Sequence, residues 1–160
     1  MTSEMPPMNE NEMNIGIRSA YMQALKSFKE GGVPVGSALL VDGAIVSLGH
    51  NRRFQRGSNI LHGEMDCIEN AGHFIDFTKS TLFTTLSPCL MCSNTILLFG
   101  IPRLVVLDTK NTDDFETSLE NLEEKGVEVI VIEHEPSIEL NRRFQTEPDT
   151  RKRWMGDVGK

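Results

Sequence analysis

Two short motifs constrain the fold of this 160-residue chain more than any other feature of its sequence. The first is His62-Gly63-Glu64, and the second is Pro88-Cys89-Leu90-Met91-Cys92. Each motif comes after a predicted strand and begins a predicted helix. Because their side chains can act together only if they meet, the fold must bring the N-termini of two helices to one point.

The first part of the chain predicts a helix followed by a hairpin. Apolar residues recur at helical spacing from Met13 to Phe28, and Gly31-Gly32 ends this pattern. Residues 35–41 and 44–48 are β-favouring, and Asp42-Gly43 between them is a strong turn signal. We therefore expect these two strands to be antiparallel neighbours.

The middle of the chain holds both motifs. The polar residues 49–59 predict a surface loop, and a helical pattern follows over 61–72. Residues 81–85 are rich in β-formers and predict a third strand. We expect Ser87 to cap the next helix, with Pro88 at its first position, and Gly100 to end it.

A helical pattern separates the last two predicted strands, 104–107 and 127–132. Parallel strands need such a crossover, so we expect these two to be parallel. The whole pattern predicts a three-layer α/β/α protein with a mixed five-stranded sheet and helices on both faces. No linker divides the chain, so we expect a loose leader over residues 1–10 and a single domain over 11–160.

The two motifs supply the ligands that zinc prefers. Cysteines three residues apart at a helix start can direct both sulfurs to one point, and His62 adds a nitrogen. Three protein ligands leave a position for water, which is typical of catalytic zinc sites. Glu64 lies two residues from His62, where it can act as a proton carrier. Cys67 falls among apolar positions and is predicted to be a core residue.

Electrostatics favour the same interpretation. Two thiolates neutralise Zn²⁺, and two helix N-termini add partial positive charge that helps to deprotonate the cysteines. Two alternatives remain open: a redox Cys-x-x-Cys pair and a zinc-stabilised binding module without turnover.

His-x-Glu followed by Pro-Cys-x-x-Cys is the signature of zinc deaminases. The chain resembles the zinc-dependent cytidine deaminase-like superfamily, and within it the fungal-type cytosine deaminases. The resemblance implies one Zn²⁺ per chain, a homodimer, and hydrolysis of free cytosine to uracil and ammonia in pyrimidine salvage. Alternative substrates are isocytosine, guanine or a nucleoside. The segments that carry the resemblance are residues 29–36, 49–52, 61–64, 84–92, 100–103 and 154–159.

The resemblance also implies roles for individual residues. His62, Cys89 and Cys92 would bind zinc, and Glu64 would shuttle protons. The remaining assignments concern the substrate. Asn51 and the backbone N–H of Gly63 would hold the pyrimidine edge, and the Ser87 carbonyl would lie near the amino group. Asp157 would meet the ring or amino group, and Trp154 would cap the pocket.

Two further features of the family bear on the substrate pocket. The tail over 147–160 would form a lid over it. At the position where fungal cytosine deaminases carry an aromatic pocket residue this chain has Thr112, and the nearest aromatic residue is Phe115.

Composition limits the partners that we expect. Asp and Glu number 23 against 16 Lys and Arg, for a net charge of -7, which argues against a sequence-independent grip on nucleic acid. No apolar run approaches a membrane span, and three cysteines do not form a disulfide framework. We expect a soluble cytoplasmic protein, with the nucleus as an additional compartment, that acts on a small molecule.

Overall fold

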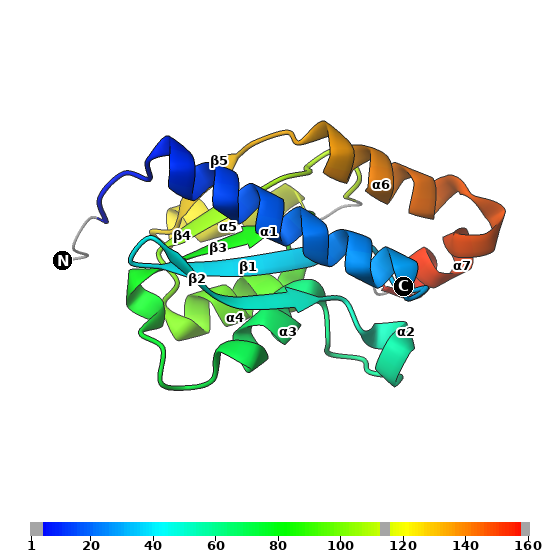
Figure 1. Ribbon diagram of the computed structural model, residues 1–160, viewed down its shortest axis with the longest axis horizontal. Coiled ribbons are helices and arrows are strands. Elements are labelled where there is room, and N and C mark those ends of the chain that lie inside the picture. Colours follow the sequence, from blue (N-terminus) through cyan, green and yellow to red (C-terminus); the bar gives the residue numbers. More distant parts are fainter. Residues whose placement is uncertain (1–4, 113–115, 158–160) are drawn as a thin grey trace.

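A five-stranded sheet forms the centre of the molecule (Figure 1). The computed structural model describes residues 5–112 and 116–157, with residues 116–118 and 155–157 described by their backbone alone. The strand order is β2-β1-β3-β4-β5. The strands are β1 (Gly36–Val41), β2 (Ala44–His50), β3 (Ser80–Thr84), β4 (Arg103–Val106) and β5 (Glu128–Val131).

The sheet is mixed, as the sequence predicts. Strand β1 is antiparallel to both β2 and β3, whereas β3, β4 and β5 are parallel to one another. The turn between β1 and β2 has positive φ at both central residues, 50° at Asp42 and 78° at Gly43, which matches the twist of a two-residue hairpin. The antiparallel first pair and the parallel last pair are therefore confirmed.

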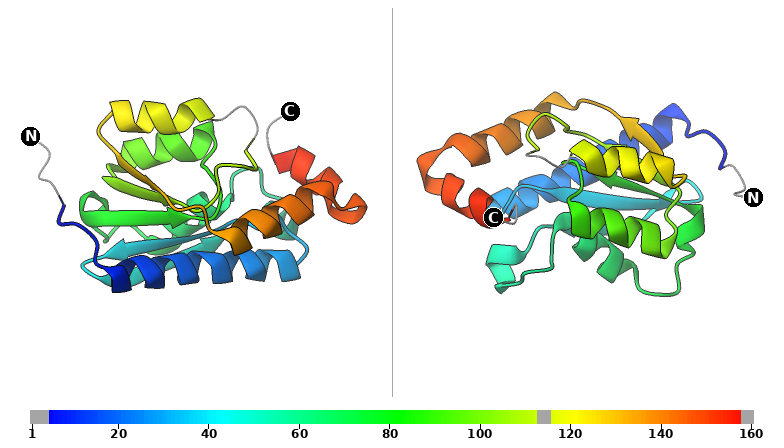
Figure 2. Two further views of the ribbon diagram at one scale, coloured as in Figure 1. Left: turned by 90° about the horizontal axis from the view of Figure 1, so that it is seen from above. Right: turned by 180° about the vertical axis from the view of Figure 1, so that it is seen from behind.

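Helices cover both faces of the sheet (Figure 2). Helices α3, α4 and α5 lie on one face, and α1 and α6 lie on the other. Helix α7 follows α6 and lies near the end of α1 (Figure 1). The helices are α1 (Glu10–Lys29), α2 (Arg53–Arg56), α3 (Gly63–Ala71), α4 (Leu90–Phe99), α5 (Glu116–Glu124), α6 (Glu135–Thr146) and α7 (Pro148–Asp157), with a 3₁₀ turn, η1 (Phe77–Lys79).

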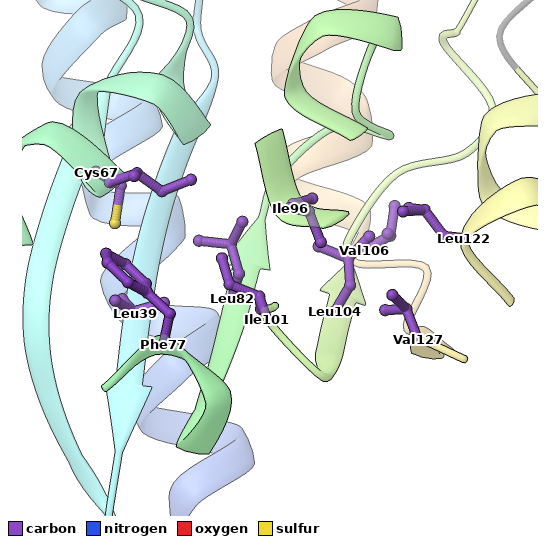
Figure 3. Close-up of a cluster of buried hydrophobic side chains, with 11 residues drawn as sticks. Leu39, Cys67, Phe77, Leu82, Ile96, Ile101, Leu104, Val106, Leu122 and Val127 are labelled. Atoms are coloured by element: carbon purple, nitrogen blue, oxygen red, sulfur yellow. The ribbon is translucent and has the colours of Figure 1, made fainter. Parts of the chain in front are cut away.

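Each layer of helices encloses its own hydrophobic cluster. Leu39, Leu82 and Ile96 belong to the cluster under α3, α4 and α5. Cys67 is fully buried there and directs its sulfur toward this cluster, as expected of a core residue (Figure 3). On the other face, α1 approaches β3 so closely that a Cβ on Gly16 would lie 2.1 Å from the Phe83 ring.

Two local predictions are wrong. The segment expected to be a surface loop over 49–59 instead extends β2 to His50, contains helix α2, and buries both His50 and Asn51. Helix α4 is capped by Cys89 and not by Ser87, because the Ser87 N–H bonds the Asp108 carbonyl at 2.9 Å and stays with the sheet. The polarity of a segment and the cap preference of a residue are local properties, so they do not predict contacts with residues that are distant in the chain.

Part of the expected leader contacts the sheet. Arg103 Nη2, at the start of β4, donates to the Pro6 carbonyl at 2.8 Å. Within the described ranges, none of the helices combines the length and the apolar character needed to cross a bilayer.

Candidate active site

Three potential metal ligands meet where α3 and α4 begin. His62 is the N-cap residue of α3 and Cys89 is that of α4, and neither side chain caps its own helix. The Nδ1 atom of His62 lies 3.5 Å from the Cys89 Sγ and 3.8 Å from the Cys92 Sγ. All three ligand atoms lie within 4.8 Å of one another.

This spacing fits a tetrahedral zinc ion. With bonds of about 2.3 Å to sulfur and about 2.0 Å to nitrogen, neighbouring ligand atoms of a tetrahedral site lie about 3.6 Å apart. Two sulfurs and one imidazole are also a donor set that zinc prefers. The residues present therefore fit zinc, with a fourth position that these three ligands do not fill.

The contact between the two cysteines shifts their pKa values in opposite directions. Hydrogen bonding to Cys92 lowers the pKa of the Cys89 thiol to about 4. The same contact, together with burial, raises the pKa of Cys92 well above its usual range. A metal ion favours the thiolate form of both, because a coordinating thiol is deprotonated.

Glu64 lies in the first turn of α3 and is 3% exposed. Burial raises its pKa to about 7, and the negative charge on Cys89 adds to the rise. A carboxyl group poised near neutrality can both accept and release a proton. Its place beside the three ligands suits it to general acid–base chemistry.

Asn51 is 1% exposed and is held by its backbone and its side chain. Its N–H donates to the Val35 carbonyl at 2.9 Å. Its own carbonyl accepts hydrogen bonds from Ser27 Oγ and Gln55 Nε2, both at 2.9 Å. Its Oδ1 accepts from the Arg53 N–H at 3.0 Å, at the start of α2. The conformation of Asn51 is therefore fixed before any substrate binds.

Gly63 is the first residue of α3, and Ser87 lies three residues before the first residue of α4. A Cβ on Gly63 would lie 2.9 Å from the Val35 carbonyl, the same group that receives the Asn51 N–H, so only glycine allows this approach. The hydroxyl of Ser87 is buried and has no hydrogen-bond partner among the described residues.

The C-terminal helix packs against the α1–β1 connection. Trp154 is 5% exposed and packs in a cluster with Val33, Val35, Leu86 and Phe144. Arg153 Nη1 donates to the Gly31 carbonyl. Asp157 ends α7, but its side chain lies outside the described residues.

Thr112, at the position of the family aromatic, is hydrogen-bonded within its own turn. Thr112 Oγ1 donates to the Thr109 carbonyl at 3.1 Å, and Phe115 lies outside the described residues.

Sequence analysis missed two buried carboxylates near the site, Asp66 and Asp108. Asp66 accepts hydrogen bonds from His50 and Arg52. Asp108 accepts from Asn141 Nδ2 at 2.9 Å, and that amide also donates to the Thr85 carbonyl. The only local signal for Asp66 is a charged residue on the apolar face of its helix.

Comparisons with known proteins place the chain among deaminases. Residues 11–108 match the family model described as the cytidine and deoxycytidylate deaminase zinc-binding region. The chain is 41% identical over 147 residues to a cytosine deaminase of Candida albicans, covering 90% of this chain and 95% of that protein. It is 31% identical over 101 residues to a tRNA-specific adenosine deaminase of Bacillus subtilis, covering 61% and 62%. A guanine deaminase structure from Nitrosomonas europaea shares the fold, with a TM-score of 0.72, 18% identity, and coverage of 89% and 88%.

Proposed function

Because the chain belongs to the cytidine and deoxycytidylate deaminase zinc-binding family, we propose that it hydrolyses free cytosine to uracil and ammonia. The observation that carries the proposal is the meeting of His62, Cys89 and Cys92 beside a buried Glu64. A zinc ion held by these ligands supplies a hydrolytic nucleophile at neutral pH, because zinc lowers the pKa of water.

Glu64 transfers the protons of this reaction. Its carboxylate accepts a proton from water and donates it to ring N3, while the water oxygen adds to C4. Glu64 then takes the proton of the new C4 hydroxyl and passes it to the amino group, which leaves as ammonia. A C4–O bond has then replaced the C4–N bond.

Four further groups orient the base in this proposal. Asn51 and the Gly63 N–H hold the pyrimidine edge, and the Ser87 carbonyl accepts from the amino group. Asp157 meets the ring or the amino group from α7. The tail over 147–160 acts as a lid, and the packing of Trp154 against Val33 and Val35 supports this role. Hydrogen bonds of this kind reject analogues that lack the bonded group much more strongly than apolar walls do.

A free base is a better candidate than a polynucleotide. The relative named cytosine deaminase aligns over 90% of this chain, whereas the relative named tRNA-specific adenosine deaminase aligns over 61%. The net charge of -7 also disfavours a phosphate backbone as partner. We place the reaction in pyrimidine salvage in the cytoplasm.

Helix α4 supports a homodimer. Its first residue and its last four residues, 96–99, are apolar, and Ser93, Asn94 and Thr95 lie between them. Of the apolar residues, Leu90 is 63% exposed, Leu98 80% and Phe99 42% in the single chain. A second copy of the chain that packs on α4 would bury this surface.

Ammonia release from zinc-loaded protein tests the proposal. We expect cytosine to react faster than isocytosine, guanine, cytidine or adenosine. A preference for a nucleoside would overturn the substrate and leave the reaction class in place. Folded, zinc-loaded protein that releases no ammonia from any of the five would indicate a zinc-binding module instead. In that case chelation should unfold the chain, whereas a catalytic site loses activity first.

A further inference from the structure

A single carboxylate oxygen links the two neighbours of Asn51 to the helix that carries the metal site. Asp66 lies on α3, four residues after His62, and is 4% exposed. Its Oδ2 accepts a hydrogen bond from the His50 N–H at 3.0 Å and another from Arg52 Nε at 3.2 Å. The link therefore joins α3 to the chain on both sides of Asn51.

The contacts around Asp66 compensate for its burial. A buried carboxylate is costly unless charged or N–H donors face it. Here the guanidinium of Arg52 supplies the positive charge, and its side chain is 25% exposed. The ring of His50 extends away to α1, with Nε2 2.8 Å from Glu30 Oε1 and Nδ1 3.3 Å from Gln23 Oε1.

The geometry has a consequence for catalysis. Helix α3 begins just after His62 and carries Glu64, so these groups move together with Asp66. Through Asp66, both neighbours of Asn51 are tied to the same helix that carries the metal ligand and the proton carrier. A binding group that is already held in its bound conformation favours affinity, so such a link matters for substrate binding.

We infer that Asp66 is a positioning residue that holds Asn51 in register with the metal site, with Arg52 as its partner. This inference rests on the proposed function, in which Asn51 binds the pyrimidine. Asp66 itself does not touch the substrate. Its effect is expected on substrate binding more than on the chemical step.

The test is Asp66→Asn, which keeps the size of the side chain and removes its charge. We expect KM for cytosine to rise about tenfold, the effect of one weakened charge-assisted hydrogen bond, while kcat stays within about twofold. Zinc content should remain at one per chain. Glu69→Gln is the matched control, because it removes a negative charge from the exposed side of the same helix and should leave KM unchanged.

A second variant covers the case in which Asp66→Asn does not fold. Arg52→Leu removes one donor from a partly exposed position, and we expect KM to rise in the same direction. Because both residues share one contact, the double variant should raise KM by less than the product of the two single effects. An unchanged KM in both single variants would overturn the inference.

Amide hydrogen exchange separates this inference from the proposed function. In zinc-loaded protein without substrate, Asp66→Asn should speed exchange over residues 50–53 about tenfold relative to wild type. Equal exchange rates would refute the positioning role whatever the substrate is. A wild-type protein that does not deaminate cytosine would refute the proposed function, while the exchange result would still decide whether Asp66 holds this segment.

Discussion

At the scale of single residues, Glu64 is the group on which turnover should depend most. The substitution Glu64→Gln keeps the shape of the side chain and removes its ability to transfer protons. We expect ammonia release to fall about 10²–10⁴-fold, the usual contribution of general acid–base catalysis. Zinc should remain bound, because the three ligands are elsewhere. Turnover within about tenfold of wild type, with zinc confirmed by metal analysis, would remove Glu64 from the mechanism.

The burial of Glu64 should also make the metal-free protein less stable at high pH. Its pKa is raised from 4.5 to about 7 in the folded chain, mainly by burial. Between these values the unfolded chain has released the proton and the folded chain still binds it, so stability falls as pH rises. The shift corresponds to about 3 kcal/mol, fully lost above about pH 7.

A neutral side chain at this position avoids that loss. We therefore expect metal-free Glu64→Gln to be more stable than metal-free wild type at about pH 8, and the difference to shrink toward about pH 5. Urea unfolding of both proteins in chelator, at both pH values, measures it. The same difference at the two pH values would show that ionisation of Glu64 is not the cause.

The meeting of His62, Cys89 and Cys92 could be predicted because each motif is local in sequence and begins a helix after a strand. His62 and Glu64 are two residues apart, and Cys89 and Cys92 are three apart. Asp66 could not be found in this way, because its partners His50 and Arg52 come from the end of β2 and the residues just after it.

At the scale of elements, the contact of Arg153 with the α1–β1 connection should help to hold helix α7 in place. Arg153 donates to the Gly31 carbonyl and lies over the Phe144 ring at 5.6 Å, whereas its neighbour Lys152 is exposed. We expect Arg153→Ala to loosen α7, which raises KM for cytosine and speeds proteolysis of the tail several-fold. Lys152→Ala is the control and should change neither. Equal proteolysis of the two variants would show that Arg153 does not hold the helix.

The elements from α1 to β5, apart from α2 and η1, followed from periodicity and turn signals. The β1–β2 hairpin was predictable because Asp42-Gly43 is a strong signal for a two-residue hairpin turn. The parallel end of the sheet was predictable because a helix separates its strands. The cap of α4 was not predictable, because Ser87 is a better cap by itself than Cys89. The N–H of Ser87 instead donates to the backbone carbonyl of Asp108, a residue 21 positions later in the chain.

At the scale of the whole molecule, helix α4 presents apolar side chains to solvent that a single chain leaves exposed. Helix α4 packs Ile96 into the core under β3 and β4, but it also presents Leu98 to solvent at 80% exposure. Sequence alone shows that α4 is rich in apolar residues, and the structure shows which of them are exposed. The exposed residues lie on the helix that holds Cys92, so assembly and catalysis share one element.

The oligomeric state should therefore respond to a charge on α4 and not to one on α1. We expect wild type to have twice the 17.9 kDa mass of the chain by light scattering. Leu98→Glu should give the mass of one chain, because it places a charge in the centre of the proposed interface. Met22→Glu is the control, since Met22 is also more than half exposed but lies on the opposite face of the sheet. A wild-type monomer, or a Leu98→Glu variant that remains a dimer, would contradict the assignment of α4 as the dimer surface.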